Sequence, residues 1–169
     1  MATLMTANPL NAIDAPALHG KLLYIEDEAV NVAVLQGMLV GHPGVQLILA
    51  STGLDGVRKA QAEQPDFVLL DMHLPDIGGL EVVRRLNGDI TSRGLRVTIL
   101  TGDNLSMDII KAMSLGAYEY WIKPLNLGVF EAGLRRALSG RRADPLRTLQ
   151  KHRAFVSDSA AAAAAALEP

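Results

Sequence analysis

Residues 68–79, VLLDMHLPDIGG, contain the pattern that decides the fold. Together with Phe67 they open with a continuous apolar run, FVLL, which is typical of a parallel strand covered on both faces. Asp71 follows this run directly, and Pro75 lies in the connection after it, where a missing N–H does least harm. Residues 80–86 then place apolar side chains at helical spacing. A buried strand, a polar turn and an amphipathic helix are therefore expected to follow one another directly.

The same alternation extends in both directions from this segment. Apolar runs predict strands at residues 21–26, 46–50, 67–70, 96–100 and 118–122. Helical spacing predicts helices at residues 29–39, 53–62, 80–86, 106–115 and 127–138. On the first of these helices, Val30, Val34 and Met38 form the predicted buried face. Five strands that alternate with five helices indicate an α/β fold, a doubly wound parallel sheet with helices on both faces.

Composition limits the classes of function. The chain of 169 residues has 16 basic and 18 acidic side chains, and its net charge of −2 gives no electrostatic reason to expect nucleic-acid or membrane-surface binding. It has no cysteine, which excludes disulfides, thiol catalysis and cysteine metal sites and fits a reducing cytosol. Its apolar runs are shorter than the roughly 20 residues that span a bilayer.

We predict one domain, residues 20–140, with extensions at both ends. Residues 1–19 lack a charged start and an apolar signal core and are interpreted as a leader or linker. Residues 141–159 are interpreted as a C-terminal tail, partly helical because Asp144-Pro145 suits a helix start. Residues 160–169, AAAAAAALEP, resemble translated cloning sites and are interpreted as vector-derived.

Polar residues that can do chemistry lie where the predicted strands end. Glu26 and Asp27 close the first strand, Asp71 follows the third, Thr101 follows the fourth, and Lys123 follows the fifth. In a doubly wound sheet these ends form one edge, where ligands bind. Clustered carboxylates repel one another, and a hard cation that prefers oxygen ligands, such as Mg²⁺, removes the conflict. An aspartate can then attack phosphorus, while a metal ion, a lysine and a hydroxyl stabilise the developing charge.

Each of these residues alone also has a purely structural interpretation. An acidic pair after a strand commonly begins a helix, and a lone aspartate before a loop commonly serves a turn. Thr101 can cap a helix, and Lys123 can be a solvated surface residue. It is their joint occurrence at four separate strand ends that favours a phosphoryl-transfer site.

Four segments carry a family resemblance: YIEDE (residues 24–28), VLLDMHLPDIGG (68–79), ILTGD (99–103) and YWIKP (120–124). They resemble the signature segments of response-regulator receiver domains, the chemotaxis receivers included, over about residues 20–140. The resemblance implies a flavodoxin-like (βα)5 fold with strand order 2-1-3-4-5, an order that is known for chemotaxis receivers.

The resemblance also implies roles for the acidic residues. Asp71 matches the phosphoacceptor. Asp27 matches a direct Mg²⁺ ligand, Glu26 matches a ligand that acts through water, and the metal set includes Asp71 and the backbone carbonyl of His73. His73 and Asp103 stand at the two positions that commonly tune how fast the phosphoryl group is lost.

Three further residues match the switch machinery of these domains. Thr101 matches the hydroxyl that swings toward the phosphoryl group, and Tyr120 matches the aromatic residue that turns inward with it. Lys123 matches the lysine that pairs with the phosphoryl group, and its peptide bond to Pro124 is expected to be cis.

A two-component receiver is therefore the expected function: a phosphoprotein of a phosphorelay that takes its phosphoryl group from a sensor histidine kinase or a histidine phosphotransfer protein. The domain is expected to be a switch in the cytoplasm and not an enzyme, with no direct contact to nucleic acid or membrane. It is either a stand-alone regulator or the receiver of a hybrid sensor histidine kinase. A homodimer through residues 106–115, 118–122 and 127–138 is a candidate arrangement.

Two alternatives stay open beside this function. An aspartyl-phosphate hydrolase of the haloacid-dehalogenase type has a second aspartate two residues after its nucleophile, where this chain has His73. An unphosphorylated pseudo-receiver scaffold predicts losses among the four residues that resemble the reactive set, and all four are present: Asp27, Asp71, Thr101 and Lys123.

Isolated residues have simpler interpretations. His19, His42 and His152 have no partner pattern in the sequence and are expected at the surface. Trp121 lies in a predicted strand and is expected to pack in the core.

Overall fold

The computed structural model describes residues 17–102 and 106–139. The predictions for residues 1–16, for Asp103 and for residues 140–169 lie outside this part of the chain. The strands are β1 (Gly20–Ile25), β2 (Val45–Ala50), β3 (Phe67–Asp71), β4 (Arg96–Thr101) and β5 (Glu119–Ile122). The helices are α1 (Ala29–Leu39), α2 (Gly53–Glu63), α3 (Gly79–Arg93), α4 (Met107–Ser114) and α5 (Leu127–Leu138). Every predicted element is present, and only α3 differs from its predicted bounds by more than one residue.

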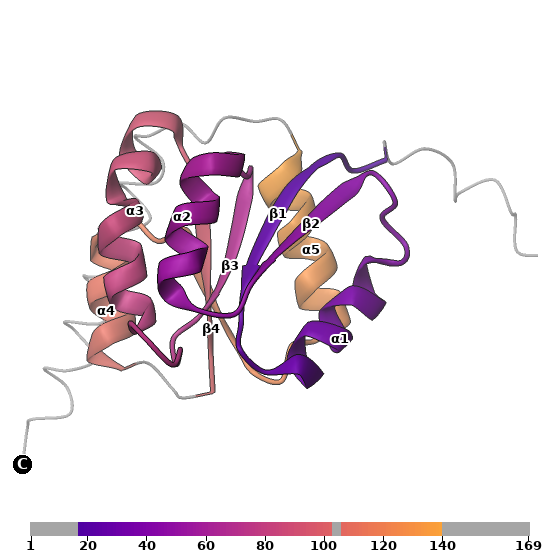
Figure 1. The fold of residues 1–169 in the computed structure, drawn as a ribbon. Coiled ribbons are helices and arrows are strands. Elements are labelled where there is room, and N and C mark those ends of the chain that lie inside the picture. The colour runs from indigo at the N-terminus through magenta and orange to yellow at the C-terminus, as the bar shows by residue number, and fades with distance from the viewer. Residues whose placement is uncertain (1–16, 103–105, 140–169) are drawn as a thin grey trace, which may run out of the picture.

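The five strands form one parallel sheet in the order β2-β1-β3-β4-β5, which confirms the predicted topology. Its register aligns the strand ends that carry the polar residues. Ile25 pairs with Leu70 across β1 and β3, so the residues that follow them, Glu26 and Asp71, lie level with each other. The carboxyl ends of the strands thus form a common edge, at which the loops to the helices begin (Figure 1).

Two apolar layers cover the two faces of the sheet (Figure 1). Alternate strand residues point to opposite faces, so Leu23 and Ile25 belong to one layer while Leu22 and Tyr24 belong to the other. Helices α2, α3 and α4 contribute to the first layer, and α1 and α5 contribute to the second. Because both faces are covered, β3 is buried along its whole length, as its continuous apolar sequence predicts.

The predicted buried face of α1 is wrong at Val30 and Val34, whereas Met38 is partly buried and packs against the layer formed by α1 and α5. Val30 and Val34 are 74% and 46% exposed, and the helix buries Leu35 and Leu39 instead. The helix sequence AVNVAVLQGML has no charged residue, so helical spacing alone fits more than one face. Although α1 is apolar, no helix in the described ranges is long and apolar enough to cross a bilayer.

Helix α3 continues to Arg93, well beyond the predicted end at residue 86, and it ends at Gly94 in the left-handed conformation. The added segment NGDITSR has low intrinsic helix propensity, which is why the pattern did not predict it. An ion pair within the helix and hydrogen bonds to other segments stabilise it. Arg93 Nε donates to Asp89 at 2.9 Å, its guanidinium also donates to the carbonyl of Pro65, and Asn87 Nδ2 donates to the carbonyl of Leu115 at 2.7 Å.

The prediction that His42 is a surface residue without a partner is wrong. Its Nε2 lies 2.8 Å from Glu131 Oε1, and this contact joins the turn after α1 to α5. Trp121 packs in the core as predicted, with its ring edge-on to Phe67 at 6.1 Å between centroids. A side chain at position 133 would collide with the Trp121 ring, so only glycine suits that point of α5.

Candidate functional site

The residues predicted to carry chemistry lie together at the carboxyl edge of the sheet. Asp71 is the last residue of β3 and Thr101 the last residue of β4. Glu26 and Asp27 follow β1 directly, and Lys123 follows β5 directly. The parallel topology thus converts positions far apart in the sequence into neighbours in space.

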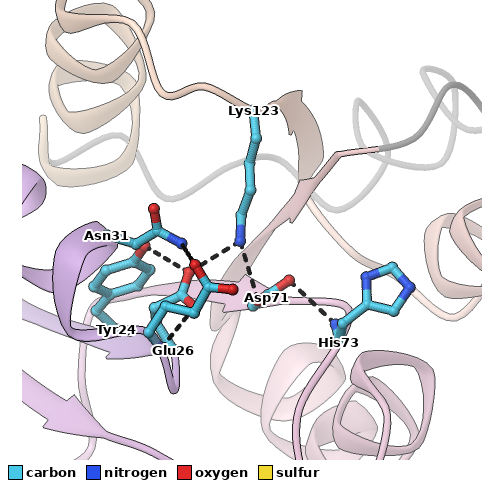
Figure 2. A network of polar contacts seen from close by, with 7 residues as sticks. Tyr24, Glu26, Asn31, Asp71, His73 and Lys123 are labelled. Carbon is cyan, nitrogen blue, oxygen red and sulfur yellow. Dashed lines mark hydrogen bonds and ion pairs between the residues drawn. The ribbon is translucent and has the colours of Figure 1, made fainter.

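Lys123 links two buried carboxylates (Figure 2). Its Nζ lies 3.0 Å from Glu26 Oε2 and 3.0 Å from Asp71 Oδ2. The side chains of Glu26 and Asp71 are 0% and 7% exposed, whereas that of Lys123 is 24% exposed. Burial alone would lower the pKa of Lys123, but its hydrogen bonds to Asp71 and Glu26 raise that pKa above the usual value. The ammonium group therefore stays charged between the two acids.

Glu26 has hydrogen-bond donors on both of its oxygens. The Tyr24 hydroxyl donates to Oε2 at 3.0 Å, beside Lys123, and the backbone N–H of Glu28 donates to Oε1 at 3.2 Å. Burial would raise the pKa of Glu26, but these donors, above all Lys123, hold it below the usual range. The reverse holds for Tyr24, where burial and the neighbouring Glu26 charge raise the pKa of the phenol well above normal.

Within residues 17–102 and 106–139, the hydrogen bonds to Asp71 differ from those to Glu26. The backbone N–H of His73 donates to Oδ1 at 3.1 Å, and Lys123 contacts Oδ2. Burial raises the pKa of Asp71 above its usual value, and the nearby charge of Glu26 adds to this effect, although His73 and Lys123 oppose it. The charge of Asp71 is thus only partly compensated by the protein.

Three carboxylates at this edge suit a divalent cation. Glu26, Asp27 and Asp71 each offer an oxygen atom within 4.8 Å of the others. Asp27 is exposed while the other two are buried, so the cluster is open to solvent on one side. An all-oxygen donor set that combines buried and solvated carboxylates fits Mg²⁺, which keeps several of its waters when a protein binds it.

The remaining predicted residues lie around this cluster. Thr101 is buried, and its backbone carbonyl accepts a hydrogen bond of 2.7 Å from the N–H of Lys123. Tyr120 is partly buried and packs against the layer formed by α2, α3 and α4. The peptide bond between Lys123 and Pro124 is cis, as expected from the resemblance. His73 is exposed, and its ring points away from the Asp71 carboxylate (Figure 2).

Two residues beside the site were not predicted from the sequence. Tyr24 lies in β1, two residues before Glu26, and in an extended chain this spacing puts both side chains on the same side, which could have indicated contact between them. Asp76, in the connection between β3 and α3, accepts hydrogen bonds from the first two residues of α2. No local pattern in the sequence points to that contact, because the partners are more than twenty residues apart.

Comparison with known proteins agrees with this geometry. A family model described as the response regulator receiver domain matches residues 22–135, which hold the whole site. The chain belongs to the response-regulator receiver family. The domain is therefore a receiver of the kind found in two-component signalling.

Curated relatives differ in length from this chain. The transcriptional regulatory protein KdpE of Mycobacterium tuberculosis is 37% identical over 117 residues, which make up 69% of this chain and 50% of KdpE. The chain thus spans half the length of that relative. Protein PilH of Pseudomonas aeruginosa is 30% identical over 120 residues, which make up 71% of this chain and 98% of PilH.

Solved structures share the fold. The receiver domain of the sensor histidine kinase PA1611 from Pseudomonas aeruginosa, solved with a magnesium ion in its active-site cleft, has a TM-score of 0.64 and 26% identity, and the match covers 72% of this chain and 99% of that one. The Saccharomyces cerevisiae complex of the phosphotransfer protein Ypd1 with the Ssk1 receiver gives a TM-score of 0.67 at 22% identity, and the match covers 77% of this chain and 96% of that one.

Proposed function

We propose that this receiver accepts a phosphoryl group on Asp71 from a phosphohistidine and changes conformation in response. The observation that carries the proposal is the arrangement of Lys123, whose ammonium group lies between the carboxylates of Glu26 and Asp71 at 3.0 Å from each. A cation in that position can contact the phosphoryl oxygens once the group is bonded to Asp71, because it already contacts the carboxylate that attacks phosphorus.

The reaction is a displacement at phosphorus. A carboxylate oxygen of Asp71 forms a bond to phosphorus, and the bond between phosphorus and the histidine nitrogen of the donor breaks. The electron pair of that bond leaves with the imidazole. Negative charge spreads over the phosphoryl oxygens during the transfer, and Lys123 offsets part of it. Hydrogen bonding from His73 to Oδ1 keeps the Asp71 carboxylate oriented throughout.

Four residues are proposed to hold Mg²⁺: Asp27 and Asp71 directly, Glu26 through water, and His73 through its backbone carbonyl. The acidic cluster supports this set, since its oxygens lie within 4.8 Å of one another. Bound Mg²⁺ supplies positive charge next to the phosphoryl oxygens. Glu26 suits an indirect role because its own oxygens already accept hydrogen bonds from Tyr24, Lys123 and Glu28.

A protein donor fits the surface next to the site. Helix α1 begins at Ala29, directly after the acidic residues, and exposes Val30 and Val34 without any charged side chain. Exposed apolar surface beside a phosphoacceptor favours a partner that covers it during transfer. We therefore propose a sensor histidine kinase or a histidine phosphotransfer protein as donor. The yeast complex of a phosphotransfer protein with a receiver provides a parallel for such a pair.

The two alternatives have less support. A hydrolase of the haloacid-dehalogenase type needs an acid–base group two residues after its nucleophile, and the ring of His73 points away from Asp71 (Figure 2). A scaffold that is never phosphorylated does not explain why Glu26 and Asp71 are buried around a lysine, because the burial of charged groups has a free-energy cost.

Acetyl phosphate provides the test. Incubation with acetyl phosphate and Mg²⁺ is expected to add one phosphoryl group, which intact-mass measurement detects. Asp71→Asn is expected to block the addition, and excess EDTA is expected to prevent it in the unaltered chain. Labelling of the Asn variant at the normal rate would exclude Asp71, and full labelling in EDTA would exclude the metal requirement.

A further inference from the structure

The β3–α3 loop, residues 72–78, carries the backbone that faces Asp71. Its two ends are fixed by backbone hydrogen bonds. Met72 donates to the carbonyl of Leu100 at 3.3 Å, and Gly79 donates to the carbonyl of Met72 at 3.0 Å. Gly79 also permits close packing at this point, since a Cβ there would lie 3.0 Å from the carbonyl oxygen of Asp71.

The middle of the loop is attached to helix α2. Asp76 Oδ1 accepts from the N–H of Gly53 at 2.7 Å, and Oδ2 accepts from the N–H of Leu54 at 2.9 Å. The loop also packs closely there, because a Cβ at Gly53 would lie 2.9 Å from the carbonyl oxygen of Ile77. Desolvation acts to raise the pKa of Asp76, yet the backbone amides around the carboxylate hold this pKa below its usual range.

We propose that Asp76 is a positioning residue: its carboxylate anchors the β3–α3 loop to α2 and thereby fixes the His73 backbone against Asp71. His73 lies between the fixed end at Met72 and the anchor at Asp76. Its N–H donates to Asp71 Oδ1 at 3.1 Å, so a shift of the loop moves a donor of the acidic site directly. Small displacements of groups around a reacting centre have large effects on rate.

The metal-binding consequence rests on the proposed function. If the His73 carbonyl is a Mg²⁺ ligand, the anchor at Asp76 also sets the distance between that carbonyl and Asp71. Residues that orient metal ligands from outside the ligand set commonly change metal affinity by about 10–100-fold when they are substituted. Asp76 acts through several backbone bonds, so an effect near the lower end, about tenfold, is expected.

Helix α2 itself offers a matched control. Thr52 caps the same helix end, and its hydroxyl accepts from the N–H of Asp55 at 3.2 Å. Thr52→Ala therefore removes a cap from α2 but leaves the Asp76 carboxylate in place, whereas Asp76→Ala removes two hydrogen bonds between the loop and α2. Asp76→Asn keeps one acceptor oxygen and places an amide group at the other position, so it provides a milder variant if the alanine variant does not fold.

The first measurement needs neither metal nor phosphodonor. Amide hydrogen exchange at His73, read by NMR on the metal-free chain, is expected to accelerate about tenfold in Asp76→Ala and less in Asp76→Asn. In Thr52→Ala the same amide is expected to exchange within about twofold of its normal rate. Normal His73 exchange in both Asp76 variants, or equal acceleration in Thr52→Ala, would overturn the positioning role.

The second measurement titrates Mg²⁺. The Mg²⁺ concentration at half-maximal binding, measured by calorimetry, is expected to rise about tenfold in Asp76→Ala and to stay near normal in Thr52→Ala. Saturating Mg²⁺ is expected to restore most of the labelling rate with acetyl phosphate, which a generally destabilised chain would not show. An unaltered chain that takes no phosphoryl group would refute the proposed function, while an unchanged Mg²⁺ midpoint in Asp76→Ala would refute the link between Asp76 and the metal.

Discussion

The carboxyl ends of β1 and β3 lie side by side, and each positions a buried carboxylate that contacts Lys123. The two carboxylates differ in how the protein compensates their negative charge. Glu26 accepts hydrogen bonds from Tyr24, Glu28 and Lys123. Asp71 accepts from His73 and shares Lys123. The pKa of Glu26 is held below its usual range, and burial raises the pKa of Asp71.

This difference fits the roles that we propose for the two acids, a supporting role for Glu26 and a reactive role for Asp71. A carboxylate that the protein stabilises fully gains little from a new partner, because a metal or phosphoryl group would have to replace existing bonds. A carboxylate with an incompletely compensated charge gains more from Mg²⁺ and from conversion to an acyl phosphate. If Asp71 is the phosphoacceptor, as proposed, its reactivity comes with a cost to the stability of the resting domain.

The largest effect is expected from removing the group that the two acids share. Lys123→Ala is expected to slow labelling by acetyl phosphate about 100-fold, because one charged donor to the phosphoryl oxygens is lost. Labelling followed by intact mass at saturating Mg²⁺ measures this. Lys111→Ala is the control, since Lys111 pairs with Asp108 on the surface of α4 at 3.9 Å. A normal labelling rate in Lys123→Ala would remove lysine from the proposed chemistry.

Glu26→Gln is expected to destabilise the domain by about 2 kcal/mol, since hydrogen bonds to a buried charged group are lost or weakened. The lowered pKa of Glu26 fixes the sign of the pH dependence. Its contribution is present above the usual carboxyl range and is lost as pH falls through the lowered value. Urea unfolding of both chains without Mg²⁺ at several pH values measures the difference. Equal stability at neutral pH would contradict the compensation described for Glu26.

Asp71→Asn is expected to act in the opposite direction and raise stability at neutral pH, on the order of 1 kcal/mol, because it removes an incompletely compensated charge. Because the pKa of Asp71 is raised in the folded state, ionisation of its carboxyl group lowers the stability of the domain once the pH rises above the usual aspartate pKa. The gain from asparagine is therefore expected to vanish once pH falls below that value, where Asp71 is protonated in both states. Thermal unfolding across this pH range measures it. A loss of stability in Asp71→Asn at neutral pH would show that both acids are equally well compensated.

The sequence was sufficient to predict the sheet and the residues at its edge. Apolar runs such as FVLL locate the strands, and parallel topology then places Glu26, Asp71 and Lys123 at one edge whatever the details of packing. The contrast between the two acids could not be predicted in the same way. It depends on which donors reach each oxygen, and Lys123 lies 97 residues from Glu26 in the chain.

Other differences have physical causes that a local pattern does not contain. In α1, apolar residues occur on several sides of the helix itself. Periodicity therefore could not show that the buried face contains Leu35 and Leu39 and not Val30. The last turns of α3 are held by Arg93, whose guanidinium donates to the carbonyl of Pro65, not by their own propensity. Such contacts exist only once distant segments meet.

The smallest effect on labelling is expected at Thr101, whose backbone carbonyl accepts a hydrogen bond from the N–H of Lys123. If its hydroxyl supplies one neutral hydrogen bond to the phosphorylated state, that bond is worth about 0.5–1.5 kcal/mol. This energy can bias a two-state equilibrium by only about tenfold and is small beside the barrier to phosphoryl transfer. Thr101→Ala is therefore expected to label on Asp71 within about threefold of the normal rate, yet to shift less toward the active conformation. Amide exchange in α4, β5 and α5 at saturating beryllofluoride measures the shift, and Thr101→Ser, which keeps the hydroxyl, is the control. Suppose that Thr101→Ala keeps the full conformational response while Lys123→Ala labels at the normal rate. The roles assigned to Lys123 in phosphoryl transfer and to Thr101 in the conformational change would then be wrong. Other residues at the strand ends would have to fill these roles.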